Sequence, residues 1–179
     1  MVQTSDFTAG VPPVLLHELL ARAAACWPSH IALTAGTQHL AYGDVQLQVE
    51  CCAAGLLGLG LARGARVAVY LEKRLETVVA SFAAPAAGGV LVPVNALLKA
   101  SQVEHILRDA GATVLVTSVA RLAALAPVLG SCPELRHVVL CDDMSPAAPD
   151  SWPAGLGLHG WAHRLPDQPT AWPTVLESD

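Results

Sequence analysis

The chain has 179 residues, a length that fits one domain. Hydrophobic residues make up 53% of it and charged residues only 14%, so it can bury a large core and is not intrinsically disordered. The formal net charge is −5 and no basic run occurs, which argues against a surface that follows nucleic-acid phosphates. Lys73 and Lys99 are the two lysines, so any catalytic lysine must be one of them.

The cysteine pattern favours a reducing compartment. An odd number of cysteines without a repeated C-x-x-C spacing argues against a disulfide framework or a zinc knuckle; they are Cys26, Cys51, Cys52, Cys132 and Cys141. The N-terminal residues lack the basic segment and apolar run of a signal peptide, so we expect a cytoplasmic protein. The uncharged stretch 77–98 is long enough to span a membrane, but its glycines and prolines predict a helix, a Gly88-Gly89 stop and a buried strand. We therefore expect no transmembrane segment.

The first part of the chain predicts a helix, a hairpin and a second helix, in that order. Residues 14–26 place leucines and alanines on one helical stripe. Two short extended pieces, 31–35 and 39–42, flank Gly36-Thr37-Gln38, which predicts a hairpin. From Asp44 onward apolar residues recur with a helical period, and Gly60 stands where a left-handed C-terminal cap is expected.

Strands and helices then alternate. Strands are predicted at 66–71, 90–94, 113–117 and 137–141, and helices at 75–87, 101–109 and 119–129. Ser101-Gln102-Val103-Glu104 has the spacing of a capping box at the start of a helix. Strands that are apolar on both faces and alternate with helices predict an α/β fold, with a mostly parallel sheet covered by helices on both faces.

Composition divides the chain into three segments. Residues 1–13 are expected to be a flexible N-terminus, and residues 14–143 an α/β subdomain preceded by the helix and the hairpin. Residues 144–179 are rich in proline and tryptophan, and we expect a surface excursion with one short helix near residues 152–155. Thr174-Val175-Leu176 predicts the start of another extended segment.

Three glycines superficially resemble a dinucleotide-binding fingerprint. Gly58, Gly60 and Gly64 follow a predicted helix and precede a predicted strand. A phosphate-binding turn needs the reverse order, because the amides at a helix N-terminus hold the anion. We therefore expect a helix cap and a tight turn, and assign no cofactor-binding residue.

Two other polar pairs could take part in chemistry. His159 and His163 have the spacing of two metal ligands on one helical face, but the surrounding glycines favour exposed loop histidines, so no metal-binding residue is assigned. Asp142 and Asp143 follow a predicted strand, where α/β proteins often place functional acids. A solvated turn is the simpler expectation for them.

Nucleophilic catalysis has no support in the sequence. Cys51 and Cys52 lie in a predicted helix, with Cys52 on its apolar stripe, and buried thiols usually only pack. No G-x-S-x-G motif occurs, and His17 in the first helix is expected on the surface rather than as a general base. No catalytic residue is assigned.

A resemblance to a known family rests on four stretches in order. They are residues 40–45 (LAYGDV), 53–56 (AAGL) leading to 64–69 (GARVAV), 87–95 (AGGVLVPVN) and 106–117 (ILRDAGATVLVT). In this order, over roughly residues 15–141, the sequence resembles the N-terminal subdomain of AMP-forming acyl-CoA ligases of the adenylate-forming superfamily. Residues 71–79 and 95–99 are similar to a subgroup associated with exosortase systems. Ala96, where the family often has proline, and Pro85 within a predicted helix depart from the pattern.

The resemblance implies a ligase reaction in the complete enzyme. Such enzymes join a carboxylic acid to ATP, release pyrophosphate, and pass the acyl group from acyl-AMP to coenzyme A, so ATP, Mg²⁺ and coenzyme A are implied. The family's Ser/Thr/Gly-rich phosphate loop is expected just after a sequence like that of residues 175–179, and these 179 residues do not contain it. We therefore expect this chain alone to bind no cofactor and to be inactive.

The resemblance also leaves the partner open. The rest of the ligase, on the same or a separate chain, or a second copy of this chain would cover its apolar surface. The alternative is a non-enzymatic α/β module that docks onto a separately encoded ligase remainder or another partner.

Overall fold

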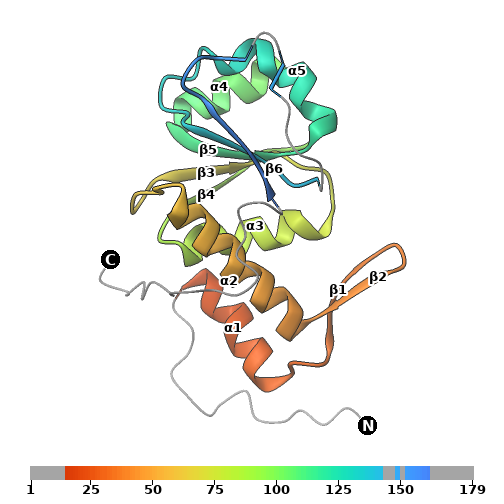
Figure 1. Cartoon of the computed structure of the whole chain (residues 1–179). Coiled ribbons are helices and arrows are strands. Elements are labelled where there is room, and N and C mark those ends of the chain that lie inside the picture. Colours follow the sequence, from red (N-terminus) through yellow and green to blue (C-terminus); the bar gives the residue numbers. More distant parts are fainter. Residues whose placement is uncertain (1–14, 143–147, 150–151, 162–179) are drawn as a thin grey trace.

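The computed structural model describes residues 15–142, 148–149 and 152–161, which form helices and two sheets in the order that follows (Figure 1). The elements are α1 (Leu16–Cys26), β1 (Ile31–Ala35), β2 (Gln38–Ala41), α2 (Tyr42–Gly58), β3 (Arg66–Val69), α3 (Leu75–Ala86), β4 (Val90–Pro93), α4 (Ala100–Ala110), β5 (Ala112–Thr117), α5 (Val119–Leu129), β6 (His137–Leu140) and β7 (Gly157–Gly160). The predicted α/β fold, with a helix and a hairpin ahead of it, is confirmed.

The main sheet has five parallel strands in the order β4-β3-β5-β6-β7, and β1 and β2 form a separate antiparallel pair. The strand order follows from where each crossover goes. The chain leaves β3, adds β4 on one side, and then crosses back to add β5 on the other side. The direction in which strands are added to the sheet therefore reverses at β3, which has β4 on one side and β5 on the other.

Successive strand residues face opposite layers of helices. Val67, Val69, Val114 and Val116 pack with α2 and α3 in one core, whereas Ala68 and Leu115 pack with α4 and α5 in the other. Figure 1 shows these two helix layers on opposite faces of the sheet. Strands buried on both faces need apolar residues at every position, which explains runs such as RVAV and ATVLVT.

Gly88 and Gly89 separate a helix from a strand, as predicted for the uncharged stretch 77–98. Helix α3 continues through Pro85 to Ala86, and Gly88 takes a φ of +78°. A Cβ on Gly89 would lie 3.0 Å from the carbonyl oxygen of Ala65, so the close approach of β4 to the start of β3 requires glycine there. In the part of the chain that the structure describes, no helix has both the length and the apolar character needed to cross a bilayer.

The start of α4 differs from the predicted capping box. The helix begins at Ala100, and the backbone N–H of Lys99 donates to Oε1 of Gln102 at 3.0 Å. The residue preceding the helix is thus a lysine, whose side chain cannot accept the reciprocal hydrogen bond. The prediction that Ser101 and Glu104 cap this helix is wrong, because the backbone already turns helical one residue earlier.

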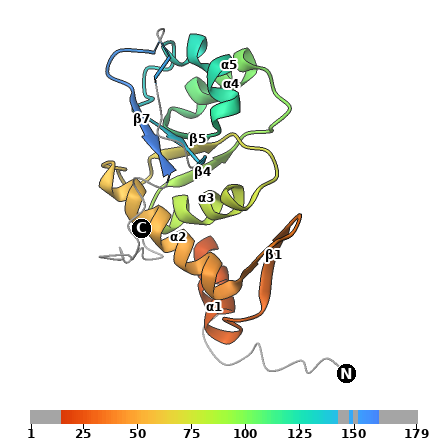
Figure 2. The same ribbon diagram turned by 45° about the vertical axis from the view of Figure 1, so that its right-hand side comes forward.

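A fifth strand of the main sheet lies in the segment predicted as a surface excursion. Strand β7 pairs in parallel with β6, with His137 opposite Gly157, and lies at the edge of the sheet (Figure 2). The short helix predicted near residues 152–155 is instead a turn, in which the Leu156 N–H donates to the Pro153 carbonyl at 3.2 Å and Gly155 has a φ of +83°. Thr174-Val175-Leu176 lies outside the described residues.

Candidate functional site

The carboxyl edge of the main sheet is the first place to look for a site. Open α/β sheets bind ligands outside the carboxyl ends of their strands, where the strand order reverses. Here that place lies beyond β3 and its neighbours β4 and β5. The side chains that follow these strands therefore decide whether a ligand could enter.

Tyr70 and Arg121 contact each other beside this switch point. The Tyr70 hydroxyl donates to the Leu98 carbonyl at 2.7 Å, and the Arg121 guanidinium lies 4.4 Å above the Tyr70 ring. Arg121 also donates to the Ala96 carbonyl at 2.9 Å and to Glu72 Oε2 at 3.0 Å. Arg121 thus lies over Tyr70 just beyond β3, and its Nε and Nη1 both donate within the fold.

A second group of charges ties α3, β6 and α5 together. Arg74 donates two hydrogen bonds to Glu76, at 2.8 and 2.9 Å, and one to Asp142 Oδ1 at 3.0 Å. Asp142 Oδ2 accepts the Val119 N–H at 2.6 Å. Burial opposes ionisation of Asp142, but the hydrogen bonds from Val119 and Arg74 outweigh it and lower the pKa of that carboxyl.

The structure therefore gives Asp142 a structural role. It is not the freely solvated turn residue that the sequence favours, because it accepts the first N–H of α5 and pairs with Arg74. Asp143 lies outside the described residues. The Arg74–Asp142 pair joins residues 68 positions apart, so no local sequence pattern could reveal it.

Neither lysine lies on a glycine-rich loop. Lys73 precedes α3 and Lys99 precedes α4, at the helix starts where the sequence places them. Gly60 and Gly64 have φ values of +81° and +71° and connect α2 to β3, at the opposite edge of the sheet from the carboxyl ends. The predicted role of these glycines as a cap and a tight turn is confirmed.

His159 is not a loop histidine. It lies on β7, and its Nε2 is 3.1 Å from Nδ1 of His137 on β6. A Cβ on Gly157 would come within 2.6 Å and 2.8 Å of these two nitrogens, so glycine makes room for the pair. His163 lies outside the described residues. Within the described ranges, no group of three or more His, Cys, Asp or Glu side chains could hold a metal.

Buried groups in the helices pack rather than react. Cys51 and Cys52 are buried, and burial raises the pKa of Cys52 above its ordinary value, so its thiol stays protonated. The expectation that His17 lies on the surface is wrong, because it is only 8% exposed and burial lowers its pKa. Ser118 at the start of α5 is buried and its Oγ has no hydrogen-bond partner. No sequence pattern singles out this serine.

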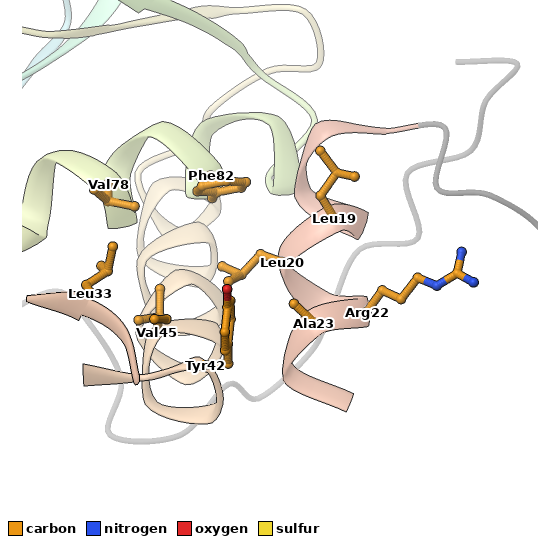
Figure 3. Close-up of a pocket in the computed structure, with 10 residues that line it drawn as sticks. Leu19, Leu20, Arg22, Ala23, Leu33, Tyr42, Val45, Val78 and Phe82 are labelled. Atoms are coloured by element: carbon orange, nitrogen blue, oxygen red, sulfur yellow. The ribbon is translucent and has the colours of Figure 1, made fainter. Parts of the chain in front are cut away.

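An open pocket of about 340 Å³ lies between α1, β1, α2 and α3 (Figure 3). Its lining is apolar apart from the Tyr42 hydroxyl and Arg22, and consists of Leu19, Leu20, Arg22, Ala23, Ala32, Leu33, Tyr42, Val45, Val78 and Phe82. Figure 3 shows the Arg22 guanidinium pointing away from the other lining side chains. The pocket can hold apolar groups, and it has the size of small ligand sites.

Comparison with known protein sequences finds ligases and peptide synthetases. The chain is 34% identical over 139 residues to phosphinothricin tripeptide synthetase PhsC of Streptomyces viridochromogenes, covering 78% of this chain and 12% of the relative. It is 32% identical to an L-proline–[L-prolyl-carrier protein] ligase of Pseudomonas fluorescens, covering 77% and 27%. It is 36% identical to the long-chain-fatty-acid–CoA ligase FadD15 of Mycobacterium bovis, covering 58% and 17%. The chain thus spans between about an eighth and a quarter of these relatives.

Comparison with solved structures matches the fold. Coronafacic acid ligase from Pectobacterium brasiliense superposes with a TM-score of 0.79 at 15% identity, over 90% of this chain and 31% of that one. The anthranilate CoA ligase AuaEII, solved with anthranoyl-AMP, superposes with a TM-score of 0.68 at 27% identity, over 72% and 25%. The described fold is that of the N-terminal subdomain of adenylate-forming ligases.

A family model supplies the assignment that no single site provides. The model described as "AMP-binding enzyme" matches residues 20–172, which is most of the chain. This range includes both sheets and all of the charged groups described at the carboxyl edge. The chain therefore belongs to the AMP-binding enzyme family.

Proposed function

We propose that this chain is the N-terminal part of an AMP-forming acid–CoA ligase. In the complete enzyme a carboxylate attacks the α-phosphorus of ATP and releases pyrophosphate, and the thiol of coenzyme A then attacks the acyl-AMP and releases AMP. The family match over residues 20–172 is the observation on which the proposal rests. The 36% identity to a fatty-acid–CoA ligase supports coenzyme A as the acceptor. The cytoplasm, which holds both cosubstrates, is the compartment we propose for it.

We assign these residues a scaffolding role in that enzyme. At the carboxyl edge, Arg121 donates to Glu72 and to a backbone carbonyl, and Arg74 donates to Glu76 and Asp142. Both guanidinium groups thus donate hydrogen bonds to groups of this chain, and these donors are not available to a phosphate. Adenylyl transfer from ATP to the carboxylate needs amides and cations aimed at the charge that develops on the phosphate groups, and losing even one such donor typically costs about 10²–10³ in rate. We therefore propose that ATP, Mg²⁺ and coenzyme A bind through the remainder of the ligase and that the 179 residues alone are inactive.

ATP–pyrophosphate exchange tests this proposal. The purified 179-residue chain and the same chain joined to the downstream ligase sequence are assayed with a panel of fatty, aryl and amino acids. We expect exchange from the longer protein with a fatty or aryl acid and none from the 179-residue chain. Exchange by the short chain refutes the scaffolding role, and exchange that depends on an amino acid such as proline refutes the acid–CoA assignment.

The alternative is a non-enzymatic module that docks onto a separately encoded ligase remainder. The open apolar pocket between α1, β1 and α3 favours it, because exposed apolar surface marks interaction sites. Co-expression with a neighbouring ligase reading frame distinguishes the two. A complex that adenylates no acid while the frame alone does so supports the module.

A further inference from the structure

Few side chains hold strand β7 at the edge of the main sheet (Figure 2). Gly157 and Gly160 at its two ends have no side chain, so Leu158 and His159 make its side-chain contacts. Leu158 packs against the core on the α4 and α5 side, and His159 lies on the opposite face because side chains alternate along a strand. Glycine weakens a strand, so the contact that His159 makes is important for keeping β7 paired.

That contact joins two histidines across neighbouring strands. Nε2 of His159 lies 3.1 Å from Nδ1 of His137, and the two ring centroids are 5.2 Å apart. The centroids are thus farther apart than the nitrogens by almost two ring radii, so the two nitrogens point at each other. One nitrogen must donate its N–H and the other must accept it. This is possible when both rings are neutral or when one is protonated, but not when both are protonated.

The groups around the pair do not offset a second positive charge. Residues 51–58 of α2 cover this face of β6, since Cys52 and Leu56 line one small cavity together with Val139. Among the described residues, neither β5 nor the turn at 152–156 carries a charge, and residues 51–58 contribute only buried thiols. Burial raises the pKa of Cys52, so this thiol stays neutral.

The nearest charged groups in the sequence are mostly cations. The charged residues at the amino ends of β3 and β6, and in the connections that lead to these strands, are Arg63, Arg66, Glu134 and Arg136. Glu134 pairs with Arg136 at 3.7 Å. Positive charge is therefore in excess at this end of the sheet, and it opposes the uptake of a second proton by the pair.

We propose that His137 and His159 form a pH-sensitive contact that holds β7 at the sheet edge near neutral pH and releases it on acidification. Histidine ordinarily titrates near pH ~6.5, so at neutral pH the pair binds at most one extra proton and keeps its hydrogen bond. A second proton would place two like charges 3.1 Å apart. The unfolded chain can protonate both rings freely and so binds more protons, which means that the contribution of the pair to stability falls as pH falls.

Release of β7 leaves the rest of the sheet paired. Strand β6 keeps its parallel ladder with β5, from His137 opposite Val114 to Leu140 opposite Thr117. The backbone edge of β6 that β7 covers becomes available to another strand. Trp161 directly follows β7 and packs against the core on the α2 and α3 side, so its environment reports whether β7 is in place.

A double-mutant cycle on the 179-residue chain tests the contact. The equilibrium constant of urea unfolding is measured for wild type, His137→Ala, His159→Ala and the double variant, at about pH 7.5 and about pH 5.0, on either side of the ordinary histidine pKa. We expect a coupling of about five-fold in this constant near pH 7.5, as for one hydrogen bond. Near pH 5.0 we expect less than about two-fold, or a reversed sign. Buried His17 is present in all four proteins, so its titration cancels.

His159→Gln separates the hydrogen bond from the titration. A glutamine amide both donates and accepts at every pH, so this variant should keep β7 in place. With Trp27, Trp152 and Trp172 replaced by phenylalanine, we expect Trp161 emission to shift to longer wavelength near pH 5.0 in the wild-type background but not in His159→Gln. His105→Gln, at an exposed position of α4, is the matched control and should keep the shift.

The outcomes decide the proposal in either direction. Equal coupling at both pH values, no coupling near pH 7.5, or an acid shift of Trp161 that persists in His159→Gln each overturns it. Circular dichroism verifies folding, and His137→Gln replaces His159→Gln if the latter does not fold. The fluorescence comparison decides alone if the alanine variants do not fold. EDTA in every sample prevents metal binding by the imidazoles, and no measurement involves ATP or an acid substrate, so the result is independent of the proposed function.

Discussion

Asp142 concentrates two interactions in one carboxylate. It accepts the first N–H of α5 and pairs with Arg74, which also holds Glu76. Replacing it by asparagine keeps the size but removes the charge. We expect Asp142→Asn to lower the free energy of unfolding at neutral pH by about 1.5–3 kcal/mol, the range for hydrogen bonds to charged groups, measured by urea denaturation.

The effect of that substitution should depend on pH. The folded state lowers the pKa of Asp142 below its ordinary value of 3.8, so the carboxylate stabilises the fold at pH values above the unfolded pKa and loses that contribution as pH falls through the folded pKa. The difference between wild type and Asp142→Asn should shrink below pH ~4. Asp109→Asn, at an exposed position of α4, is the control, and a difference that stays constant down to pH ~2 contradicts the assignment.

Gly157 is the residue on β7 most sensitive to added volume. A Cβ there would overlap the facing nitrogens of His137 and His159, so one imidazole or the strand must move. We expect Gly157→Ala to cost about 1–3 kcal/mol of stability, as overpacking does. Gly58→Ala is the matched control, because a Cβ on Gly58 at the end of α2 meets nothing within 4 Å. Equal thermal-denaturation midpoints for the two variants would contradict the crowding.

At the scale of elements, strand position should set the rate of local opening. Strand β5 lies between β3 and β6 and is almost entirely buried, whereas β7 ends the sheet and the hairpin stands apart from it. We expect the amides of β5 to exchange slowest with deuterium and those of β1, β2 and β7 fastest. Hydrogen exchange followed by mass spectrometry gives this order. Protection of β7 equal to that of β5 would contradict it.

The elements that the sequence predicts are those whose burial produces an apolar pattern within the element itself. Strand β5 (ATVLVT) is apolar at nearly every position because helices cover both of its faces, and this composition reveals it without a structure. Strand β7 (GLHG) has neither an apolar run nor an alternation of apolar and polar residues. It is a strand because its backbone pairs with that of β6. Pairing of that kind depends on distant residues and leaves no local pattern.

Side-chain contacts are as hard to predict from local sequence as strand β7 is. The spacing of Ser101 and Glu104 predicts a cap that the backbone does not use. No local pattern connects Arg74 with Asp142, and none indicates that His17 is buried. Resemblance over many residues was informative where single residues were not. Family and fold were predictable because many weak local matches add up, whereas side-chain geometry depends on contacts between distant segments.

At the scale of the whole molecule, the two cores share one sheet and should unfold together. Leu115 and Val116 are consecutive residues that face opposite cores. Leu115→Ala leaves a cavity on the α4 and α5 side and should cost about 2–5 kcal/mol. Trp152 packs against that core and Trp161 against the other, so two single-tryptophan versions report the two sides. We expect both fluorescence transitions to shift equally in urea; a shift confined to Trp152 would show independent cores.

The strand order also bears on synthesis at the ribosome. Strand β3 is translated first and ends up inside the sheet, and each later strand is added to an edge that already exists. A nascent chain can therefore extend its sheet outward in the order of translation, without opening pairs already made. Strands β3, β5 and β6 each wait only until a later strand of the sheet is translated, which limits the time during which their unpaired edges are available to other nascent chains.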